Sequence, residues 1–224
     1  IDGPELFAKW CEDRYNNKEV YLCSTNHRVV PLGHYSFITS VELFYKKLKD
    51  KDLEQQIKKD TNKLIEIQTP NGKFNEENVN KVKKILNMMK KKDIYMKRSN
   101  VLNSLCKYLK NNEMLPGIVF IFSRKLVEMT AEEITINLLE DDSKIPYTVK
   151  KECDSIIRKL PNYEEYLNLD EYKRLVSLLE KGVGIHHSGM IPVLREIVEM
   201  MISKKYIKLL FATESFAIGL DCPI

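Results

Sequence analysis

The sequence predicts an α/β fold in which a parallel sheet is flanked by helices. Short continuous apolar runs alternate with stretches of helical periodicity through the second half of the chain. Apolar runs of about four to eight residues are typical of strands buried on both faces, and their alternation with helices favours right-handed crossovers between parallel neighbours. We therefore expect one sheet-centred domain with an appendage, or two small domains, in the 224 residues.

The first 45 residues predict a short helix and two strands. A helix is expected over residues 5–11, and the apolar run at residues 20–23 predicts a strand. Residues 32–38 predict a second strand, because Tyr35 and Phe37 are spaced as a strand would place them on one face.

Residues 46–112 differ from the rest of the chain because they are rich in Lys, Asn and Glu. Helical spacing is present in patches, and Pro70-Asn71-Gly72 is a turn signal. We expect a helical or partly disordered insertion with an exposed middle. The basic run at residues 90–92 is interpreted as a solvated helix face in preference to an RNA contact.

The remaining residues predict three strands separated by helices. The run at residues 118–122 has the length of a fully buried strand, and helical spacing follows over residues 125–139. The other expected elements are two helices within residues 141–179, strands at residues 183–185 and 207–212, and an amphipathic helix after Pro192.

The composition predicts a soluble, intracellular protein, with nuclear and cytoplasmic locations both open. The five cysteines form no Cys-x-x-Cys pair, which argues against a disulfide framework or a zinc site. No apolar run approaches the roughly 20 residues of a membrane span, so no membrane partner is expected. The net charge of +4 permits anionic partners without identifying one. The excess of Lys over Arg would suit an AT-rich cellular or large-virus genome.

Three blocks of sequence resemble helicase motifs, in the order in which those motifs occur. Val-Phe-Ile-Phe-Ser-Arg-Lys at residues 119–125 is similar to motif IV of the superkiller-like helicases. Residues 183–192, which contain His-His-Ser-Gly, resemble the block between motifs IV and V. Residues 210–223, with Phe-Ala-Thr-Glu-Ser-Phe-Ala-Ile-Gly-Leu, resemble motif V, and Arg-Val-Val-Pro-Leu-Gly-His-Tyr at residues 28–35 resembles a strand that comes earlier in the same family.

The resemblance implies the second RecA-like lobe of a superfamily 2 DExH-box RNA helicase of the superkiller-like, exosome-associated subgroup. We expect residues 1–45 to supply the first helix and strands of this lobe, residues 46–112 the insertion, and residues 113–224 the part with motifs IV and V. Both ends are expected to be cuts in a longer protein, so that the chain runs from just after motif III through motif V and motif VI lies beyond it.

Polar side chains that follow the predicted strands are the candidate nucleic-acid contacts. Thr213 and Ser215 follow one strand, and their hydroxyls suit phosphate oxygens at the carboxyl edge of a parallel sheet. Hydroxyls in such loops also cap turns or helices, and the pattern alone does not separate the two roles. The resemblance assigns phosphate contacts to Ser123 and Arg124 as well, and it places His187 near the nucleic-acid path.

ATP and Mg²⁺ are the cofactors that the resemblance implies, bound jointly with a first lobe. Gly219 and Asp221 would contact ATP, although Asp221 stands where the subgroup usually has Asn, which alters the hydrogen bonds on offer. The chain contains neither a Gly-x-x-x-x-Gly-Lys-Ser/Thr phosphate loop nor an Asp-Glu-x-His motif, so it has no catalytic cradle for Mg-ATP. We therefore expect no catalytic residue in this chain, an inactive fragment, and an active full-length enzyme.

Adjacent histidines, His186 and His187, raise the question of a metal site. Neighbouring residues on a strand point to opposite faces of the sheet, so the two rings cannot readily share one ion. We expect no metal at this position.

The leading hypothesis is an ATP-dependent RNA helicase that translocates on single-stranded RNA for RNA unwinding, processing or decay, with RNA-decay machinery as a partner. A DNA-repair helicase of the same superfamily, acting on DNA, is one alternative. A non-enzymatic RecA-like module that binds RNA or protein partners is another.

Overall fold

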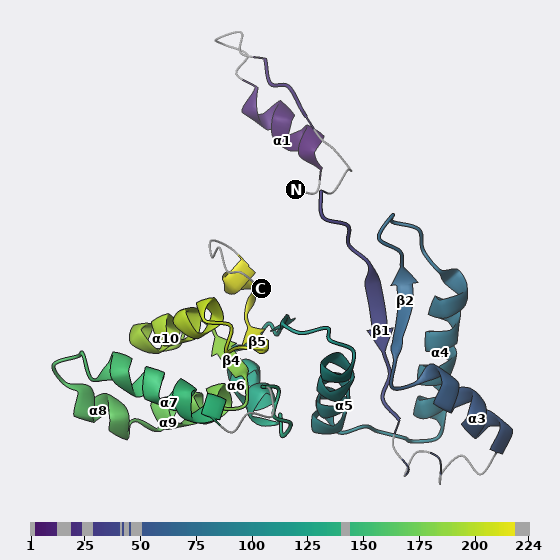
Figure 1. Ribbon diagram of the computed structural model, residues 1–224. Coiled ribbons are helices and arrows are strands. Elements are labelled where there is room, and N and C mark those ends of the chain that lie inside the picture. The colour runs from purple at the N-terminus through teal and green to yellow at the C-terminus, as the bar shows by residue number, and fades with distance from the viewer. Residues whose placement is uncertain are drawn as a thin grey trace.

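A three-stranded parallel sheet lies at the centre of the second half of the chain (Figure 1). The computed structural model describes residues 3–12, 19–23, 29–40, 42, 45, 51–139 and 144–217. The sheet has the strand order β3–β5–β4, so that β5 pairs with a parallel neighbour on each side. The strands are β3 (Gly117–Phe120), β4 (Val183–His186) and β5 (Leu209–Ala212). This parallel sheet confirms the predicted α/β class and fits a RecA-like lobe.

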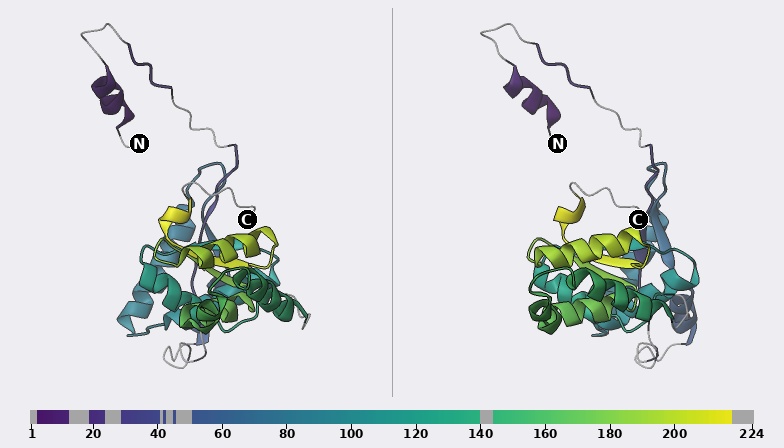
Figure 2. Two further views of the ribbon diagram at one scale, coloured as in Figure 1. Left: turned by 90° about the vertical axis from the view of Figure 1, so that its left-hand side faces the viewer. Right: turned by 60° about the vertical axis from the view of Figure 1, so that its left-hand side comes forward.

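Helices pack around this sheet and share one hydrophobic core with it (Figure 2). All residues of β4 and β5 are buried, and Val127, Ile197 and Phe211 have no exposed surface. Removal of so much apolar surface from water is the main source of this region's stability. The helices are α6 (Arg124–Glu132), α7 (Lys144–Ile157), α8 (Tyr163–Asn168), α9 (Asp170–Leu179) and α10 (Pro192–Ser203).

A second, antiparallel pair of strands lies earlier in the chain. Its strands are β1 (His34–Phe37) and β2 (Leu64–Gln68), and two helices of this region are α3 (Lys51–Asp60) and α4 (Glu76–Lys91). The turn predicted from Pro70-Asn71-Gly72 is confirmed, because Gly72 has a φ of +82° and donates its N–H to the Thr69 carbonyl.

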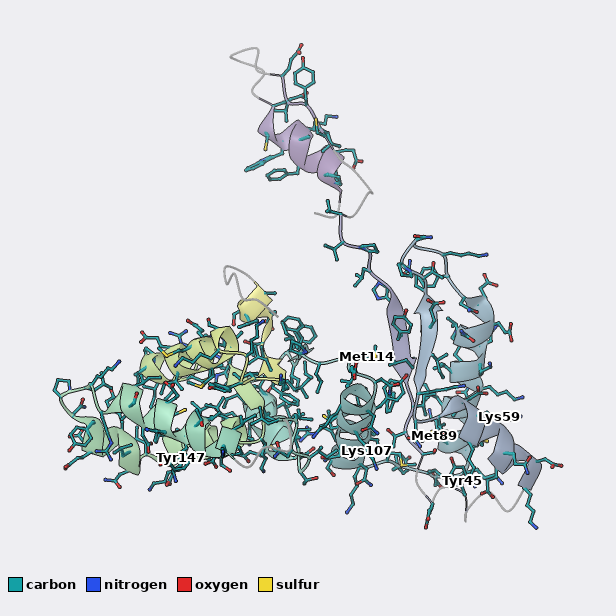
Figure 3. All side chains as sticks on the ribbon, viewed as in Figure 1. Tyr45, Lys59, Met89, Lys107, Met114 and Tyr147 are labelled. Carbon is teal, nitrogen blue, oxygen red and sulfur yellow. The ribbon has the colours of Figure 1, made fainter. Side chains whose placement is uncertain are left out.

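Two small apolar clusters hold α3 and α4 in place. One is built on Ile57 and Ile94, with Tyr45 and Met89 packed against it (Figure 3). The other contains Ile38, Ile65 and Ile85. Among the described residues, buried apolar side chains are therefore far fewer here than around the parallel sheet.

Helix α5 (Arg98–Asn111) joins the two regions. Its Tyr108 ring lies 5.6 Å from the ring of Phe37 on β1. Towards the other region, the Asn103 side chain donates to the Glu133 carbonyl and accepts from the Thr135 N–H. These bonds occupy backbone groups that follow α6, where a helix end leaves carbonyls without partners inside the helix.

Several expected elements differ in the structure. Residues 20–23 form no strand, and residues 144–179 contain three helices where two were expected within 141–179. The run at residues 118–122 was expected to be a fully buried strand, but no residue of β3 is fully buried and the Phe122 side chain after it is 83% exposed. An apolar run shows that a strand is favoured but not whether a neighbour covers its outer side. Helix α6 is also shorter than the predicted 125–139.

The first helix is confirmed as α1 (Pro4–Cys11), which has no buried residue. Its exposed apolar side chains include Leu6 and Trp10. Among the residues that the structure describes, every helix is too short or too polar to cross a bilayer.

Candidate functional site

The carboxyl ends of the three parallel strands meet at one edge of the sheet. Phe120 of β3 and His186 of β4 are both in register with Ala212, the last residue of β5. The polar residues that follow the three strands therefore lie at the same edge of the sheet, which is where open parallel sheets bind ligands. The described residues at this edge with candidate polar groups are Ser123, Arg124, His187, Ser188, Thr213 and Ser215.

Ser123 and Arg124 lie where β3 leads into α6. Ser123 is the N-cap of the helix, and its Oγ accepts the Leu126 N–H at 3.4 Å. The serine hydroxyl still has its own hydrogen to donate while it serves as a cap. Arg124 is the first residue of α6 and is exposed, so its guanidinium can reach an anion at the helix N-terminus.

Thr213 and Ser215 form a pair of hydroxyls after β5. Their oxygens are 2.8 Å apart, and Thr213 is 8% exposed. The Thr213 carbonyl accepts the N–H of Phe216, within the short 3₁₀ turn η1 (Glu214–Ala217). Because one hydroxyl donates to the other, the pair has one hydroxyl hydrogen left for a further acceptor such as a phosphate oxygen.

His187 connects the loop after β4 to α6. The ring is 3% exposed, its Nε2 lies 3.0 Å from Glu128 Oε1, and its Nδ1 accepts the Gly189 N–H at 3.2 Å. Burial lowers the pKa of His187 despite the raising effect of the Glu128 carboxylate. The lowered pKa and the hydrogen bond that Nδ1 accepts both fit a neutral ring whose Nε2–H donates to Glu128. Direct contact of His187 with a nucleic-acid strand stays a prediction.

Gly189 allows the same loop to approach Arg124 closely. A Cβ at Gly189 would lie 3.2 Å from Arg124 Cδ and 3.3 Å from His187 Nδ1. The aliphatic part of the arginine therefore lies against the glycine, and any larger residue there would push on both side chains. His187 and Gly189 thus help to position Arg124 at the sheet edge.

His186 points away from His187, as predicted from strand geometry. Its Nε2 is 3.0 Å from Glu199 Oε1 on α10, whereas His187 reaches Glu128 on α6. The His186 ring also packs edge-on against Phe216, with 4.9 Å between ring centres. Within the described part of the chain, no three His, Cys, Asp or Glu side chains gather as a metal site would require.

A polar pocket beside this edge was missed by sequence reasoning. Its volume is about 380 Å³, and its lining combines Ser188, Arg195 and Ser215 with the carboxylates of Glu196 and Glu199. Arg195 Nε and His186 Nδ1 are buried and find no hydrogen-bond partner among the described residues. Buried polar atoms without partners are costly, so the pocket is a place where water or a ligand atom would be favoured. The sequence feature that could have indicated this pocket is Arg195, a charged residue in the first turn of the amphipathic helix that begins at Pro192.

The two residues predicted to contact ATP, Gly219 and Asp221, lie outside the described residues. The structure therefore brings together Ser123, Arg124, His187, Thr213 and Ser215 at one edge of the sheet.

Comparison with known proteins relates the chain to RNA helicases along its whole length. An uncharacterised helicase of Schizosaccharomyces pombe is 30% identical over 223 residues, which is 97% of this chain and 19% of the relative. The DExH-box ATP-dependent RNA helicase DExH9 of Arabidopsis thaliana is 28% identical over 230 residues, which is 100% of this chain and 22% of the relative. The human exosome RNA helicase MTR4 is 27% identical over 236 residues, again 100% of this chain and 20% of the relative. No family model matches the chain.

The chain thus spans about a fifth of the length of these relatives. The similarity covers nearly all of its residues, including the parts outside the motif blocks. The chain belongs to the superkiller-like family of DExH-box RNA helicases, and its parallel sheet is consistent with a RecA-like lobe.

Proposed function

We propose that this chain is part of an ATP-dependent RNA helicase and that it holds the phosphates of a single RNA strand at the carboxyl edge of the β3–β5–β4 sheet. One observation carries the proposal: hydroxyls and a guanidinium from loops after two different strands meet at one edge, beside a polar pocket. Groups of this kind bind phosphate oxygens and position a strand without reading its bases.

The chemistry of the edge divides between two kinds of donor. Arg124 supplies a charged, planar group that can bind a phosphate through two parallel hydrogen bonds. Thr213 and Ser215 supply a hydroxyl pair that is already oriented by its own 2.8 Å hydrogen bond. A donor that is fixed before binding loses less conformational freedom when the strand arrives.

His187 has a positioning role in this proposal. It ties the loop after β4 to Glu128 of α6, and Gly189 in that loop lies against the arginine side chain. Arg124 is then held between its own helix and the neighbouring loop. Arg195 and Ser188 extend the same polar surface into the pocket.

Strand movement would come from closure of two RecA-like lobes on ATP, with each lobe holding the strand. Mg-ATP would supply the energy for closure, and Gly219 and Asp221 are the residues of this chain that we propose for the nucleotide edge. Because the sequence contains no phosphate loop and no Asp-Glu-x-His motif, we propose that the chain alone is inactive and that the parent protein is the enzyme. Two relatives are named for the exosome and the superkiller complex, and RNA-decay machinery is the partner we propose.

The test is the strand-stimulated ATPase activity of the full-length parent with single-stranded RNA and with DNA. We expect Arg124→Ala and Thr213→Val to lower the stimulation by RNA at least about tenfold, because loss of one charged hydrogen bond is worth roughly 1.5–3 kcal/mol.

Two matched variants separate contact from general damage. Lys125→Ala removes an exposed charge next to Arg124, and Thr130→Val removes a hydroxyl that is buried in α6 with no hydrogen-bond partner among the described residues. Both controls should keep the wild-type stimulation. Equal losses in controls and test variants would contradict the phosphate contacts, stimulation by DNA alone would favour the repair-helicase alternative, and a wild-type parent without ATPase activity would favour a non-enzymatic module.

A further inference from the structure

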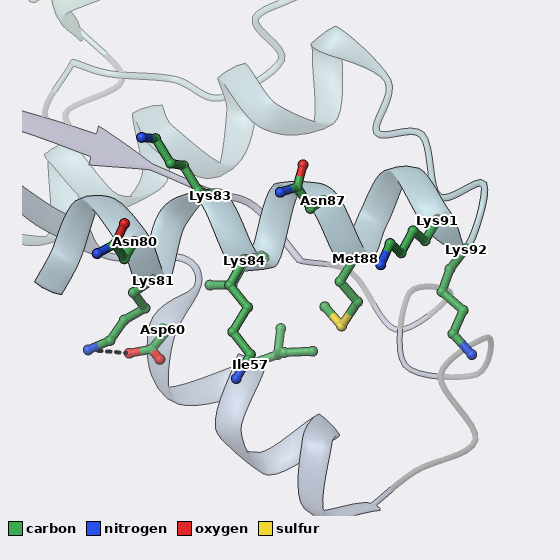
Figure 4. A pocket seen from close by; sticks show the side chains of 11 residues that line it. Ile57, Asp60, Asn80, Lys81, Lys83, Lys84, Asn87, Met88, Lys91 and Lys92 are labelled. Carbon is green, nitrogen blue, oxygen red and sulfur yellow. Dashed lines mark ion pairs between the residues drawn. The ribbon is translucent and has the colours of Figure 1, made fainter.

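A basic groove with an apolar floor lies between α3 and α4, in the region of the β1–β2 pair (Figure 4). Its volume is about 650 Å³, which falls within the range of roughly 300–1,000 Å³ typical of binding pockets. It shares no lining residue with the polar pocket beside the parallel sheet. The groove is therefore separate from the candidate strand site.

The floor of the groove comes from both helices. Ile57 of α3 and Ile85 of α4 are 3% and 5% exposed, and Met88 is partly buried beside them. Figure 4 shows Met88 pointing from α4 toward Ile57. A methionine can adjust its shape to an apolar side chain that enters from outside, because the thioether is flexible and polarizable.

Lysines dominate the rim. Asp60 is the one carboxylate among the described lining residues, and it already lies 3.8 Å from Lys81 and 3.7 Å from Lys63. No carboxylate of the described residues lies within ion-pair distance of the other lining lysines. Those lysines are Lys83, Lys84, Lys91 and Lys92.

The lysines also follow the helix periodicity. Lys84, Met88 and Lys91 are spaced by four and three residues, which places them along one face of α4. A ligand in the groove would therefore meet apolar and positive groups in alternation along the helix.

We propose that this groove binds a short acidic, amphipathic segment of a partner protein. The apolar anchors of such a segment would lie over Ile57 and Met88, and its carboxylates would pair with Lys84 and Lys91. This is the geometry by which amphipathic peptides dock on hydrophobic grooves, and the opposite charges make the encounter faster and more selective.

The lining favours a protein segment over a nucleic-acid strand. Single strands bind through base stacking on aromatic rings together with basic side chains, and they often use arginine. The described lining residues include neither an aromatic side chain nor an arginine. An apolar floor, in contrast, suits leucine or isoleucine side chains of a peptide.

The experiment uses fluorescence anisotropy of the 224-residue chain with a labelled acidic peptide. The peptide has about 14 residues, enough for nearly four helical turns, with leucines four residues apart and glutamates between them. A scrambled peptide of the same composition and a single-stranded oligouridine are the comparison ligands. We expect binding of the amphipathic peptide and at least about tenfold weaker binding of the scrambled one.

Two double variants test the assignment to this groove. Lys84→Glu/Lys91→Glu reverses two exposed charges on its rim, and Lys90→Glu/Lys107→Glu reverses two exposed charges outside it, so both change the net charge equally. We expect the rim pair to weaken binding at least about tenfold and the outside pair to change it less than about threefold. Circular dichroism of each variant confirms that the fold is retained.

The floor is tested with Met88→Gln, which keeps the side-chain length and removes the apolar contact. Weaker binding of the amphipathic peptide to this variant supports the proposal. Absence of peptide binding, equal loss in both double variants, or oligouridine binding that the rim pair abolishes while peptide binding persists would each overturn it.

Discussion

The two sheets of this molecule are stabilised in different ways. The β3–β5–β4 sheet shares one hydrophobic core with α6, α7, α9 and α10, and its central strand is buried throughout. The β1–β2 pair and its helices rest on two small clusters, together with surface ion pairs such as Lys58–Glu54 at 2.6 Å. The first region can hold polar groups in fixed positions at its edge, whereas the second has less buried surface to hold its helices in place.

The difference matches the two sites we propose. A phosphate site needs donors placed before the strand arrives, and the packed core supplies this at the edge of the parallel sheet. A docking groove for a peptide tolerates adjustment of its walls, which the small clusters between α3 and α4 permit. The following predictions test this contrast, from the largest expected effect to the smallest.

Phe211→Ala should cause the largest loss of stability. The side chain lies on the central strand with no exposed surface, so its removal leaves a cavity and should lower the free energy of unfolding by about 3–5 kcal/mol. Urea denaturation followed by circular dichroism measures the change. Phe211→Leu, which keeps most of the side-chain volume, should lower the free energy of unfolding much less. A loss below about 1 kcal/mol for the alanine variant would show that the core is not tightly packed.

Ile85→Ala should cost about 2 kcal/mol, at the low end for a buried aliphatic residue. Ile85 belongs to a small cluster whose neighbours Ile67, Val82 and Met89 are only partly buried and can move to fill the space. The same urea titration, with Ile85→Val as the conservative control, gives the value. A loss as large as that of Phe211→Ala would remove the contrast between the two regions.

Asn103→Ala tests the contacts by which α5 joins the region of the β1–β2 pair to the region of the parallel sheet. The Asn103 amide donates to the Glu133 carbonyl at 2.8 Å and accepts from the Thr135 N–H at 2.9 Å. Its removal should lower the free energy of unfolding by about 1–2 kcal/mol. Asn112→Ala is the control, because that side chain bonds the Tyr108 carbonyl within its own helix. If the two variants lose equal stability, the contacts of α5 with the residues after α6 do not join the regions.

The pH dependence from His187 should be smaller still. Its pKa is lowered by burial in the folded chain, and the unfolded chain has the usual value near 6.5, so the unfolded chain binds more protons just below that pH. Stability should therefore fall as the pH decreases through about 6.5 towards the lowered pKa, with Glu128 opposing the shift and Arg124 and His186 adding to it.

Thermal unfolding between pH 5 and pH 8, values on either side of the usual histidine pKa of about 6.5, measures this dependence. His187→Gln should flatten the slope, whereas His34→Gln, at an exposed position on β1, serves as the control. An unchanged slope in His187→Gln would show that another group causes the acid sensitivity.

Much of the parallel sheet could be predicted from the sequence. Buried strands of four residues are continuous apolar runs, as Leu209–Ala212 shows, and Pro192 and the stripe after it mark a helix start. Strand β2 was not predicted, although apolar and polar side chains alternate over residues 65–68 as in a half-buried strand, because the Lys-, Asn- and Glu-rich composition of the surrounding segment was interpreted as helix or coil. Candidate site residues were predicted by their position after strands and by resemblance to helicase motifs.

The sequence by itself determined the strands β3, β4 and β5, the start of α10 and the polar side chains that follow the strands, because these depend on patterns within a few residues. Tertiary structure alone decided which strand lies at the centre of the sheet, which atoms of His186 and Arg195 are left without partners in the described part of the chain, and how the lysines of α4 meet the apolar face of α3. These features depend on contacts between residues far apart in the chain. Strand order and the facing of two helices are set by the packing of the whole core, and a local pattern does not contain them.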